Sequence, residues 1–199
     1  QNQVKSKHQN KMKTSQLKTS LLITLVIAIA SLSSCNSQPS AKNTNGVEAP
    51  ETEIHAAVIS GNLEAVKQHI AAGTDLNTPD PFGGSSPLIT AALFGNEEIV
   101  KALLDAGVKV NFTNNEGSTA LHTAAFFCET QIVKMLLENG ADKTIKNNYD
   151  STPLASVQGP FSDLKGVYVM MEKQLSPMGF SLDLQHIEET RPKVAALLQ

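Results

Sequence analysis

The sequence predicts an all-α solenoid of about four stacked helix pairs, the last of them enlarged. The first observation is a repeat, because Ile99-Val100 and Leu103-Leu104 recur 33 residues later as Ile132-Val133 and Leu136-Leu137. The second is that these apolar residues stand at i, i+1, i+4 and i+5, which is one face of a helix. The third is size: a single unit cannot bury its apolar face alone and needs neighbours on both sides.

The N-terminal segment has the composition of a secretory signal. Lysines precede an uncharged run at 21–30, and small residues follow it. A basic region, an apolar core of about ten residues and small residues beyond it are typical of a cleaved signal peptide. A membrane-spanning helix needs roughly 20 apolar residues, which disfavours a permanent span. We expect residues 1–34 to form the signal, with the true start at Met12 and residues 1–11 upstream of it.

Cys35 ends the string Leu32-Ser33-Ser34-Cys35, which resembles the lipobox of bacterial lipoproteins. That resemblance implies that the Cys35 thiol is diacylated, that the signal is cut just before it, and that the new N-terminus is acylated. Asn36 follows, rather than the Asp associated with inner-membrane retention. The resemblance therefore favours the outer membrane of a bacterial cell envelope, with the protein facing the periplasm or the surface. The alternative is a plain signal cleaved nearby, with Cys35 incidental.

Residues 35–51 predict a lipidated cysteine followed by a flexible tether. The sixteen residues 36–51 are rich in Ser, Asn, Pro and Ala and contain almost nothing to bury. A flexible chain of this length spans roughly 20–24 Å on average. The tether would lift a folded domain off a lipid surface and keep it close.

Three repeats begin with similar strings, Ser86-Pro87-Leu88-Ile89-Thr90-Ala91-Ala92, Thr119-Ala120-Leu121-His122-Thr123-Ala124-Ala125 and Thr152-Pro153-Leu154. These strings and the leucine pairs that follow them resemble the ankyrin family, whose signature is T-P-L-H-x-A-A near the start and L-L-x-x-G-A near the end. Paired alanines let adjacent helices approach closely. Ser or Thr suits the N-cap of a helix, and Pro suits its first position. Asn115-Glu116-Gly117 predicts one of the β-turn fingers that join the repeats. The resemblance implies an ankyrin-repeat domain at 52–199, with repeats at about 52–84, 85–117, 118–150 and 151–199.

Two small departures from the repeat stand out. Gly61 matches Gly95 at a shift of 34 rather than 33, and we place the extra residue in the proline-rich loop at 78–84. Cys128 stands where Gly61 and Gly95 stand in the earlier repeats. It is expected to be a small, partly buried apolar residue rather than a nucleophile.

The fourth repeat is interrupted. Its leucine pair appears only at Leu197-Leu198, which implies an insertion of about 28 residues at about 159–186. Ser162 and Asp163 are capping candidates for a helix in the insertion, and a final helix is expected at about 192–198. The segment either caps the stack or closes as a lid over its concave side. The helix of the insertion is predicted from the apolar spacing of Leu164, Val167, Tyr168, Met171 and Leu175.

Few residues suggest chemistry. His122 falls on the His of the ankyrin signature, where the resemblance implies a bond to the backbone of the next repeat. No pair of histidines has the spacing of metal ligands, and the sequence has no phosphate-binding glycine loop. After Cys35, eleven basic side chains face nineteen acidic ones, a net charge of −8 that argues against nucleic acid. We therefore expect no metal, no cofactor and no catalysis.

What remains is recognition of another protein. In the ankyrin family, partners generally meet the finger tips and the first helices of the repeats, and exposed aromatic residues are favoured contacts. For Phe94 and Phe127, packing between repeats is an equal alternative. The candidate finger residues are Pro81, Phe82, Phe112, Asn114, Asn115, Asn148 and Tyr149. The candidate first-helix residues are Leu93, Phe94, Phe126 and Phe127.

These observations favour a monomeric, lipid-anchored scaffold that binds a protein in the bacterial cell envelope. The alternative is an envelope hydrolase or other enzyme with its site in the C-terminal insertion. A third hypothesis, a cytoplasmic scaffold, requires an inactive signal. The enzyme alternative depends on carboxylates gathering beside His186, and those available are Asp163, Glu172, Asp183, Glu188 and Glu189.

Overall fold

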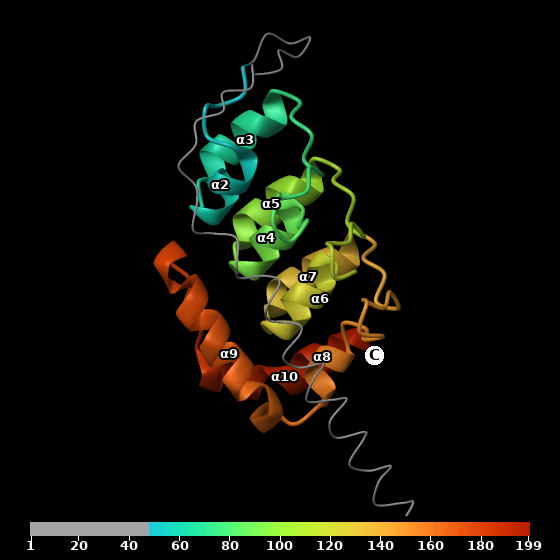
Figure 1. Ribbon diagram of the computed structural model, residues 1–199. Helices are drawn as coiled ribbons and strands as arrows, with labels where there is room; N and C mark the ends of the chain where they lie inside the picture. Colours follow the sequence, from blue (N-terminus) through green and yellow to red (C-terminus); the bar gives the residue numbers. More distant parts are fainter. Residues whose placement is uncertain (1–47) are drawn as a thin grey trace, which may run out of the picture. The chain divides into compact units, whose positions relative to one another are not determined.

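The computed structural model describes residues 48–199, and the predicted signal, Cys35 and the tether up to residue 47 lie outside them. Within 48–199 the chain forms nine α-helices, one short 3-10 helix and no strand (Figure 1). The elements are α2 (Ile54–Ile59), α3 (Leu63–Ala71), α4 (Pro87–Leu93), α5 (Glu97–Asp105), α6 (Ala120–Phe126), α7 (Thr130–Glu138), α8 (Ala155–Gln158), α9 (Phe161–Leu175), η1 (Ser176–Met178) and α10 (Leu184–Leu198). None of the described helices is long and apolar enough to cross a bilayer.

The first helices of the two central repeats begin as their sequence predicts. The side chain of Ser86 accepts a hydrogen bond from the Ile89 amide at the start of α4, and Pro87 occupies the first turn. The side chain of Thr119 accepts from the His122 amide at the start of α6. These side chains satisfy amides that have no partner inside the helix, so each cap fixes the residue at which its helix begins.

The helices stack in two rows. The first helices α2, α4, α6 and α8 form one row, and the second helices α3, α5, α7 and α10 form the other. Ala91, Ala92, Ala124 and Ala125 are fully buried, because small side chains let neighbouring helices approach closely. The leucine and isoleucine faces of α5 and α7 fill the space between the rows. The arrangement confirms the all-α stack of helix pairs.

Three fingers join the repeats, with tips at 80–85, 114–118 and 147–151. In each tip the first residue's amide donates to the last residue's carbonyl, as Asn114 does to Ser118 at 3.0 Å. The tips also bond to one another: the Asn115 amide donates to Gly83 O at 3.0 Å, and the Asn148 amide to Glu116 O at 2.9 Å. The first tip is one residue longer than the others, which confirms the extra residue expected at 78–84.

The C-terminal helices differ from their predicted bounds. Helix α9 begins at Phe161 after Pro160, so Ser162 and Asp163 lie inside its first turn instead of capping it. Helix α10 begins at Leu184 rather than near 192, because the Asp183 side chain accepts from the His186 amide and caps an earlier start. Pro192 therefore lies inside the helix. One face of α10 is buried, formed by Ile187, Thr190, Arg191, Val194 and Leu198.

Candidate protein-binding surface

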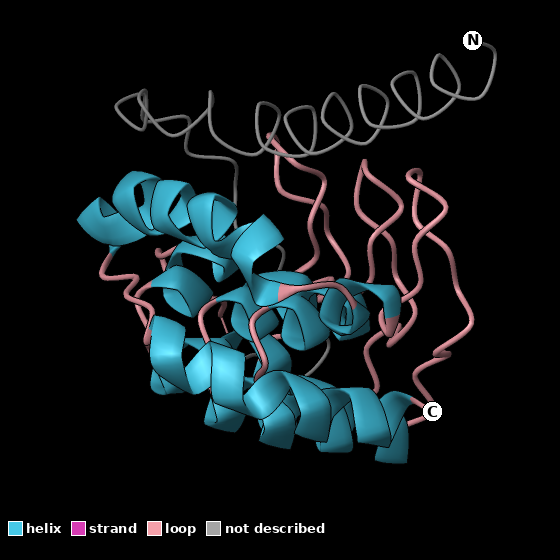
Figure 2. Cartoon of the chain, turned by 90° about the horizontal axis from the view of Figure 1, so that it is seen from below, coloured by secondary structure: helices cyan, strands magenta, loops and turns pink. Residues whose placement is uncertain are grey.

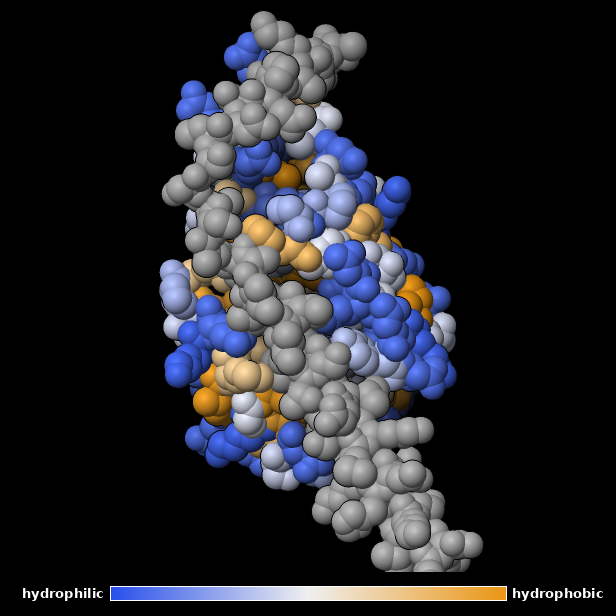
Figure 3. All heavy atoms as spheres, viewed as in Figure 1, coloured by the Kyte–Doolittle hydropathy of each residue, from blue (hydrophilic) through white to orange (hydrophobic). Residues whose placement is uncertain are grey.

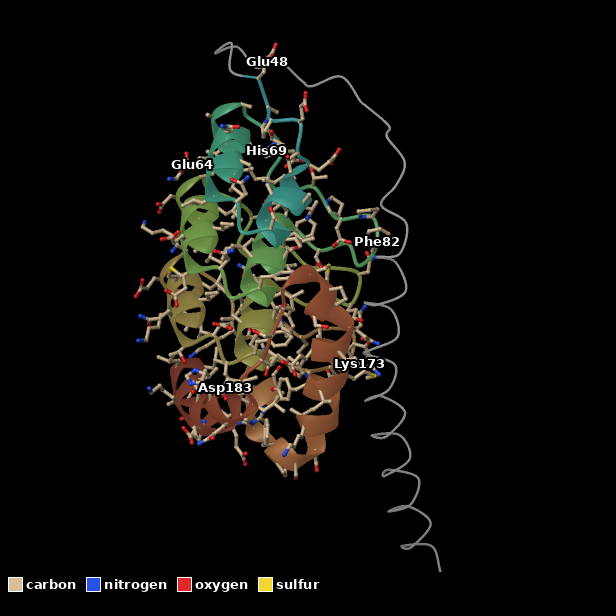
Figure 4. All side chains as sticks on the ribbon, turned by 90° about the vertical axis from the view of Figure 1, so that its left-hand side faces the viewer. Glu48, Glu64, His69, Phe82, Lys173 and Asp183 are labelled. Carbon is tan, nitrogen blue, oxygen red and sulfur yellow. The ribbon has the colours of Figure 1, made fainter. Side chains whose placement is uncertain are left out.

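The fingers and α9 lie on the same side of the stack, at opposite edges, with the first helices between them (Figure 2). We call the exposed residues of α2, α4, α6 and the three finger tips the finger-side surface. The second helices form the opposite side. In Figure 4, Phe82 on the first finger and Lys173 on α9 lie on one side of the domain, and Glu64 on α3 lies on the other.

The first finger offers the most exposed aromatic ring on this surface. Pro81 and Phe82 are exposed at its tip, and 37% of Phe82 is accessible. The Asp80 carboxylate fixes the tip, because Oδ1 accepts from the amides of Phe82 and Gly83, each at 2.8 Å. With its backbone held, the finger presents Phe82 without a large loss of conformational freedom on binding.

The second and third fingers place their predicted residues less favourably for contact with a partner. Asn114 is half-buried, and its Oδ1 accepts from the Glu116 and Ser118 amides at 3.0 and 2.9 Å, which makes it a structural residue. Asn115 and Asn148 are exposed, and the Asn148 side-chain amide donates to Asn115 O at 3.0 Å. Phe112 and Tyr149 are half-buried.

Phe127 does not belong to the exposed surface. It is only 5% accessible, because it packs edge-on against Phe126, with ring centroids 5.0 Å apart, and against Phe180, at 5.5 Å. Phe94 is half-buried and meets Phe180 edge-on at 5.8 Å. Phe127 is therefore packed between helices and is not exposed. Leu93 and Phe126 are also half-buried.

Tyr168 on α9 completes this aromatic cluster. Its ring is fully buried and lies 4.7 Å from the Phe126 ring, centroid to centroid, and its hydroxyl donates to Phe126 O at 2.6 Å. Phe161 also stacks on the Tyr168 ring, with the centroids 5.8 Å apart. Burial raises the pKa of Tyr168 well above its usual range, so the hydroxyl stays neutral. The cluster fastens α9 to the C-terminal end of α6.

Arg191 on α10 holds the inserted segment to the stack. It is buried, and its guanidinium donates to Ser156 O at 3.1 Å, to Gly159 O at 2.8 Å and to the Tyr168 hydroxyl at 3.4 Å. These acceptors come from the end of α8 and from α9. The roles of Arg191 and Phe180 do not follow from the sequence pattern, since both residues lie outside the repeats. The one signal was that Arg191 is the only Arg in a lysine-rich chain.

Comparison with known proteins agrees with this geometry. A family model described as ankyrin repeats in three copies matches residues 54–147. The domain is an ankyrin-repeat domain. The crystal structure of the ankyrin repeat domain of Bcl-3, a member of the IkappaB family, superimposes with a TM-score of 0.52 and 31% identity over 60% of this chain and 53% of that chain. Protein phosphatase 1 regulatory subunit 27 from Homo sapiens is 38% identical over 64 residues, which are 32% of this chain and 41% of that protein. The chain thus spans about half or less of the length of both.

His122 plays the structural role expected of the ankyrin signature. Its Nε2 donates to Ser151 O of the next repeat at 3.0 Å, while Nδ1 accepts from the Thr119 amide at 3.1 Å. This pattern requires a neutral ring. Burial lowers the pKa of His122, although the bond to Ser151 works in the opposite direction. The histidine joins the third and fourth ankyrin repeats.

Cys128 is a buried residue of the turn between α6 and α7. Its φ of +60° is left-handed, like the +68° of Gly61 and the +65° of Gly95 at the matching positions. Burial raises the pKa of the Cys128 thiol to about 11, so almost none of it is thiolate at neutral pH. Cys128 is therefore a packed residue, as expected. A nucleophilic cysteine needs a lowered thiol pKa, whereas burial raises the pKa here.

Glu129, at the start of α7, is a half-buried acid whose pKa is shifted. Burial raises the pKa of its carboxyl group, and the nearby charge of Glu97 adds to the effect. The two acids follow equivalent turns of successive repeats. Their proximity therefore arises from the stacking itself.

The carboxylates of the insertion do not gather into a site. Glu172 accepts from the Leu182 amide at 2.9 Å, and Glu189 accepts from the side chain of Gln185 at 2.8 Å. Asp183 is the N-cap of α10. Within residues 48–199, no three His, Cys, Asp or Glu side chains are placed to hold a metal ion. Ankyrin domains are typically binding modules without catalysis, and Glu172, Asp183 and Glu189 take part in local hydrogen bonds.

Proposed function

We propose that this protein is a lipid-anchored ankyrin scaffold of the bacterial cell envelope, held to the membrane through Cys35. It binds one protein partner through the finger-side surface and carries out no reaction itself. Its localisation is the outer membrane, facing the periplasm or the surface. The lipobox resemblance of Leu32-Ser33-Ser34-Cys35 supports the anchor, and the ankyrin fold supports the binding role.

The binding proposal rests on one observation: the inserted segment covers one end of the finger-side surface and leaves the other end exposed. At α6, Phe127 is buried beneath Phe180 and Tyr168, so the insertion occupies the far end of the first helices. At the first finger, Pro81 and Phe82 remain exposed, and Asp80 holds their backbone. The partner therefore contacts chiefly the first two repeats and the finger tips, with Phe82 as the central aromatic contact.

The comparisons support a role without catalysis. The human relative is named a regulatory subunit of a phosphatase, a description of a protein that acts through a partner. We carry over only that general role, because this chain covers 41% of that relative.

Site-specific photocrosslinking tests the partner surface. A photoreactive amino acid replaces Phe82 in one variant and Lys101 in the other, since Lys101 is exposed on α5 on the opposite side. We expect a discrete crosslinked product in envelope fractions for position 82 and none for position 101. Phe82→Ala should weaken binding of the crosslinked partner by about tenfold or more. This corresponds to a loss of ~1.4 kcal/mol or more of binding free energy. Equal crosslinking from both positions would contradict the proposal.

Metabolic labelling with palmitate tests the anchor. The wild-type chain should incorporate the label and sediment with membranes, whereas Cys35→Ala should do neither. Cys128→Ala is the matched control, because Cys128 is buried and should leave labelling unchanged. Labelling that persists in Cys35→Ala would exclude Cys35 as the lipid attachment site.

A further inference from the structure

Helix α9 exposes an apolar pair on its outer side. Val169 is 48% accessible and Met170 is 37% accessible, and the other exposed large apolar residue of 48–199 is Phe82, at the finger tip. The inner side of α9 is buried through Tyr168, Met171 and Leu175. The helix is thus fully docked by one face, and the apolar pair plays no part in that docking.

Lysines flank this pair. Lys165 and Lys173 are exposed and stand one turn before and one turn after Val169, so the three side chains follow one line along the helix. We call Lys165, Val169, Met170 and Lys173 the α9 patch. Glu172 lies outside it, since its carboxylate accepts from the Leu182 amide at 2.9 Å and is half-buried.

Most acidic side chains lie elsewhere. Glu64, Glu97, Glu98 and Glu138 are exposed on the second helices, and Figure 4 places Glu64 on the side opposite Lys173. In Figure 3, orange apolar residues gather over α9 at the lower left, while blue residues cover much of the remaining visible surface. Among the described helices, α9 thus carries an exposed apolar pair flanked by lysines, with the exposed Asp163 in its first turn.

This chemistry matches the interface of an anionic lipid layer. Apolar side chains enter the boundary between headgroups and acyl chains, and lysines beside them pair with lipid phosphates. Two apolar residues bind a membrane weakly on their own. A lipid anchor changes this, because tethering raises the effective concentration of the patch at the surface to the order of millimolar. A tether of sixteen residues extends to about 50 Å at most, enough to let α9 reach the surface.

We propose that the α9 patch is a membrane contact that lies on anionic lipid headgroups. The inference rests on the proposed anchor at Cys35 and adds an orientation to it. With α9 against the lipid, the domain does not tumble freely on its tether. The exposed Glu64, Glu97, Glu98 and Glu138 of the second helices lie on the side of the stack opposite α9.

Tryptophan fluorescence tests the contact, because the chain contains no Trp. Met170→Trp places a probe in the patch, and Lys134→Trp places a matched probe on exposed α7. Each full chain is purified as cells process it and reconstituted in phosphatidylethanolamine vesicles containing phosphatidylglycerol and brominated acyl chains. We expect quenching of about twofold or more for Met170→Trp and none for Lys134→Trp. Adding Lys165→Glu and Lys173→Glu should abolish the quenching.

The mass of the N-terminal peptide reports separately whether Cys35 carries lipid. If it does not, coupling the Cys35 thiol to a maleimide lipid supplies the anchor, so failure of the anchor and failure of the α9 patch remain distinguishable. Equal quenching of both probes, or no quenching of Met170→Trp on anchored protein, would overturn the proposal. So would a Met170→Trp signal that changes only when a soluble protein is added, since the patch would then bind protein rather than lipid.

Discussion

The last turn of each finger needs a residue with positive φ, and the three repeats meet this need differently. Gly84 has φ of +67° and Gly117 of +73°, whereas Asp150 occupies the matching place with φ of +58°. A side chain in this conformation crowds its own backbone, at a cost of about 1 kcal/mol that glycine avoids. Asp is among the residues that tolerate this strain best. The third finger therefore keeps the same turn although Asp150 stands where the other two fingers have glycine.

Asp150→Gly should raise the free energy of unfolding by about 0.5–1 kcal/mol, because the strain disappears. The lost ion pair with Lys146 is exposed and contributes little. Urea denaturation measures the change. The control is Gly117→Asp, the reverse substitution, where an added Cβ would lie 2.8 Å from Asn148 Oδ1. That variant should be destabilised, and a stable Gly117→Asp would refute the assignment of strain to these turns.

His122 should make stability depend on pH. Burial lowers its pKa below the ordinary 6.5, so between these two values the unfolded chain binds a proton that the folded chain does not. The free energy of unfolding should therefore fall as pH drops through 6.5, by at most about 1.4 kcal/mol per pH unit for one proton. Chemical denaturation at pH 7.5 to 5 measures this contribution.

His122→Gln should remove that contribution and flatten the fall with pH. At pH 7 the variant should also lose about 1–3 kcal/mol, because the bond to Ser151 spans two repeats. Gln131→Ala, on exposed α7, is the control and should keep the wild-type pH dependence. Parallel curves for wild type and His122→Gln would show that the histidine does not titrate on unfolding.

At the scale of elements, α9 is a helix that no repeat motif accounts for. It docks through aromatic contacts of Tyr168 and is followed by Phe180, which fills the space between Phe94 and Phe127. The second helix of the fourth repeat comes only afterwards, as α10, against α7 and α8. The inserted segment thus covers the end of the first-helix row before the chain returns to complete the stack.

Phe180→Ala should lower the free energy of unfolding by about 3–5 kcal/mol, because it empties a site lined by two aromatic rings. Hydrogen exchange should rise most in α9 and the segment that follows it. Met170→Ala, an exposed substitution on α9, should change stability by less than about 0.5 kcal/mol. If both variants behave alike, Phe180 does not hold the inserted segment.

For the whole domain, stability depends on contacts between neighbouring repeats, and Arg191 closes the C-terminal end. Its guanidinium binds carbonyls of Ser156 and Gly159 and the hydroxyl of Tyr168, so one side chain links α8, α9 and α10. In a stack with only nearest-neighbour contacts, damage at one end first loosens the repeats beside it.

Arg191→Ala should therefore cost about 3 kcal/mol or more and unfold the domain from its C-terminal end, since buried acceptors lose their donor. Hydrogen exchange should show lost protection in α7 to α10 while α2 to α5 stay protected. Lys193→Ala, exposed on α10, is the control and should behave as wild type. Uniform loss of protection across all repeats would show that the domain unfolds as one unit.

The regular repeats could be predicted because each of their signals is local and recurs. The caps Ser86 and Thr119, the buried alanines and the bond of His122 all follow from one pattern seen several times. The ends of α9 and α10 could not be predicted in this way. Pro192 suggested a helix start, but the side chain of Asp183 caps the helix two turns earlier and its buried face runs through both parts.

By itself the sequence determined the stack of helix pairs and the fingers that join them, since these depend on contacts between adjacent, similar units. Only the tertiary structure decided which part of the finger-side surface stays exposed. Phe127 is buried by Tyr168 and Phe180, which come from the inserted segment. That segment has no counterpart in the other repeats, so the repeat pattern could not show the contact. Phe82 remains exposed at the other end of that surface, and Val169 and Met170 are exposed on the helix that covers Phe127.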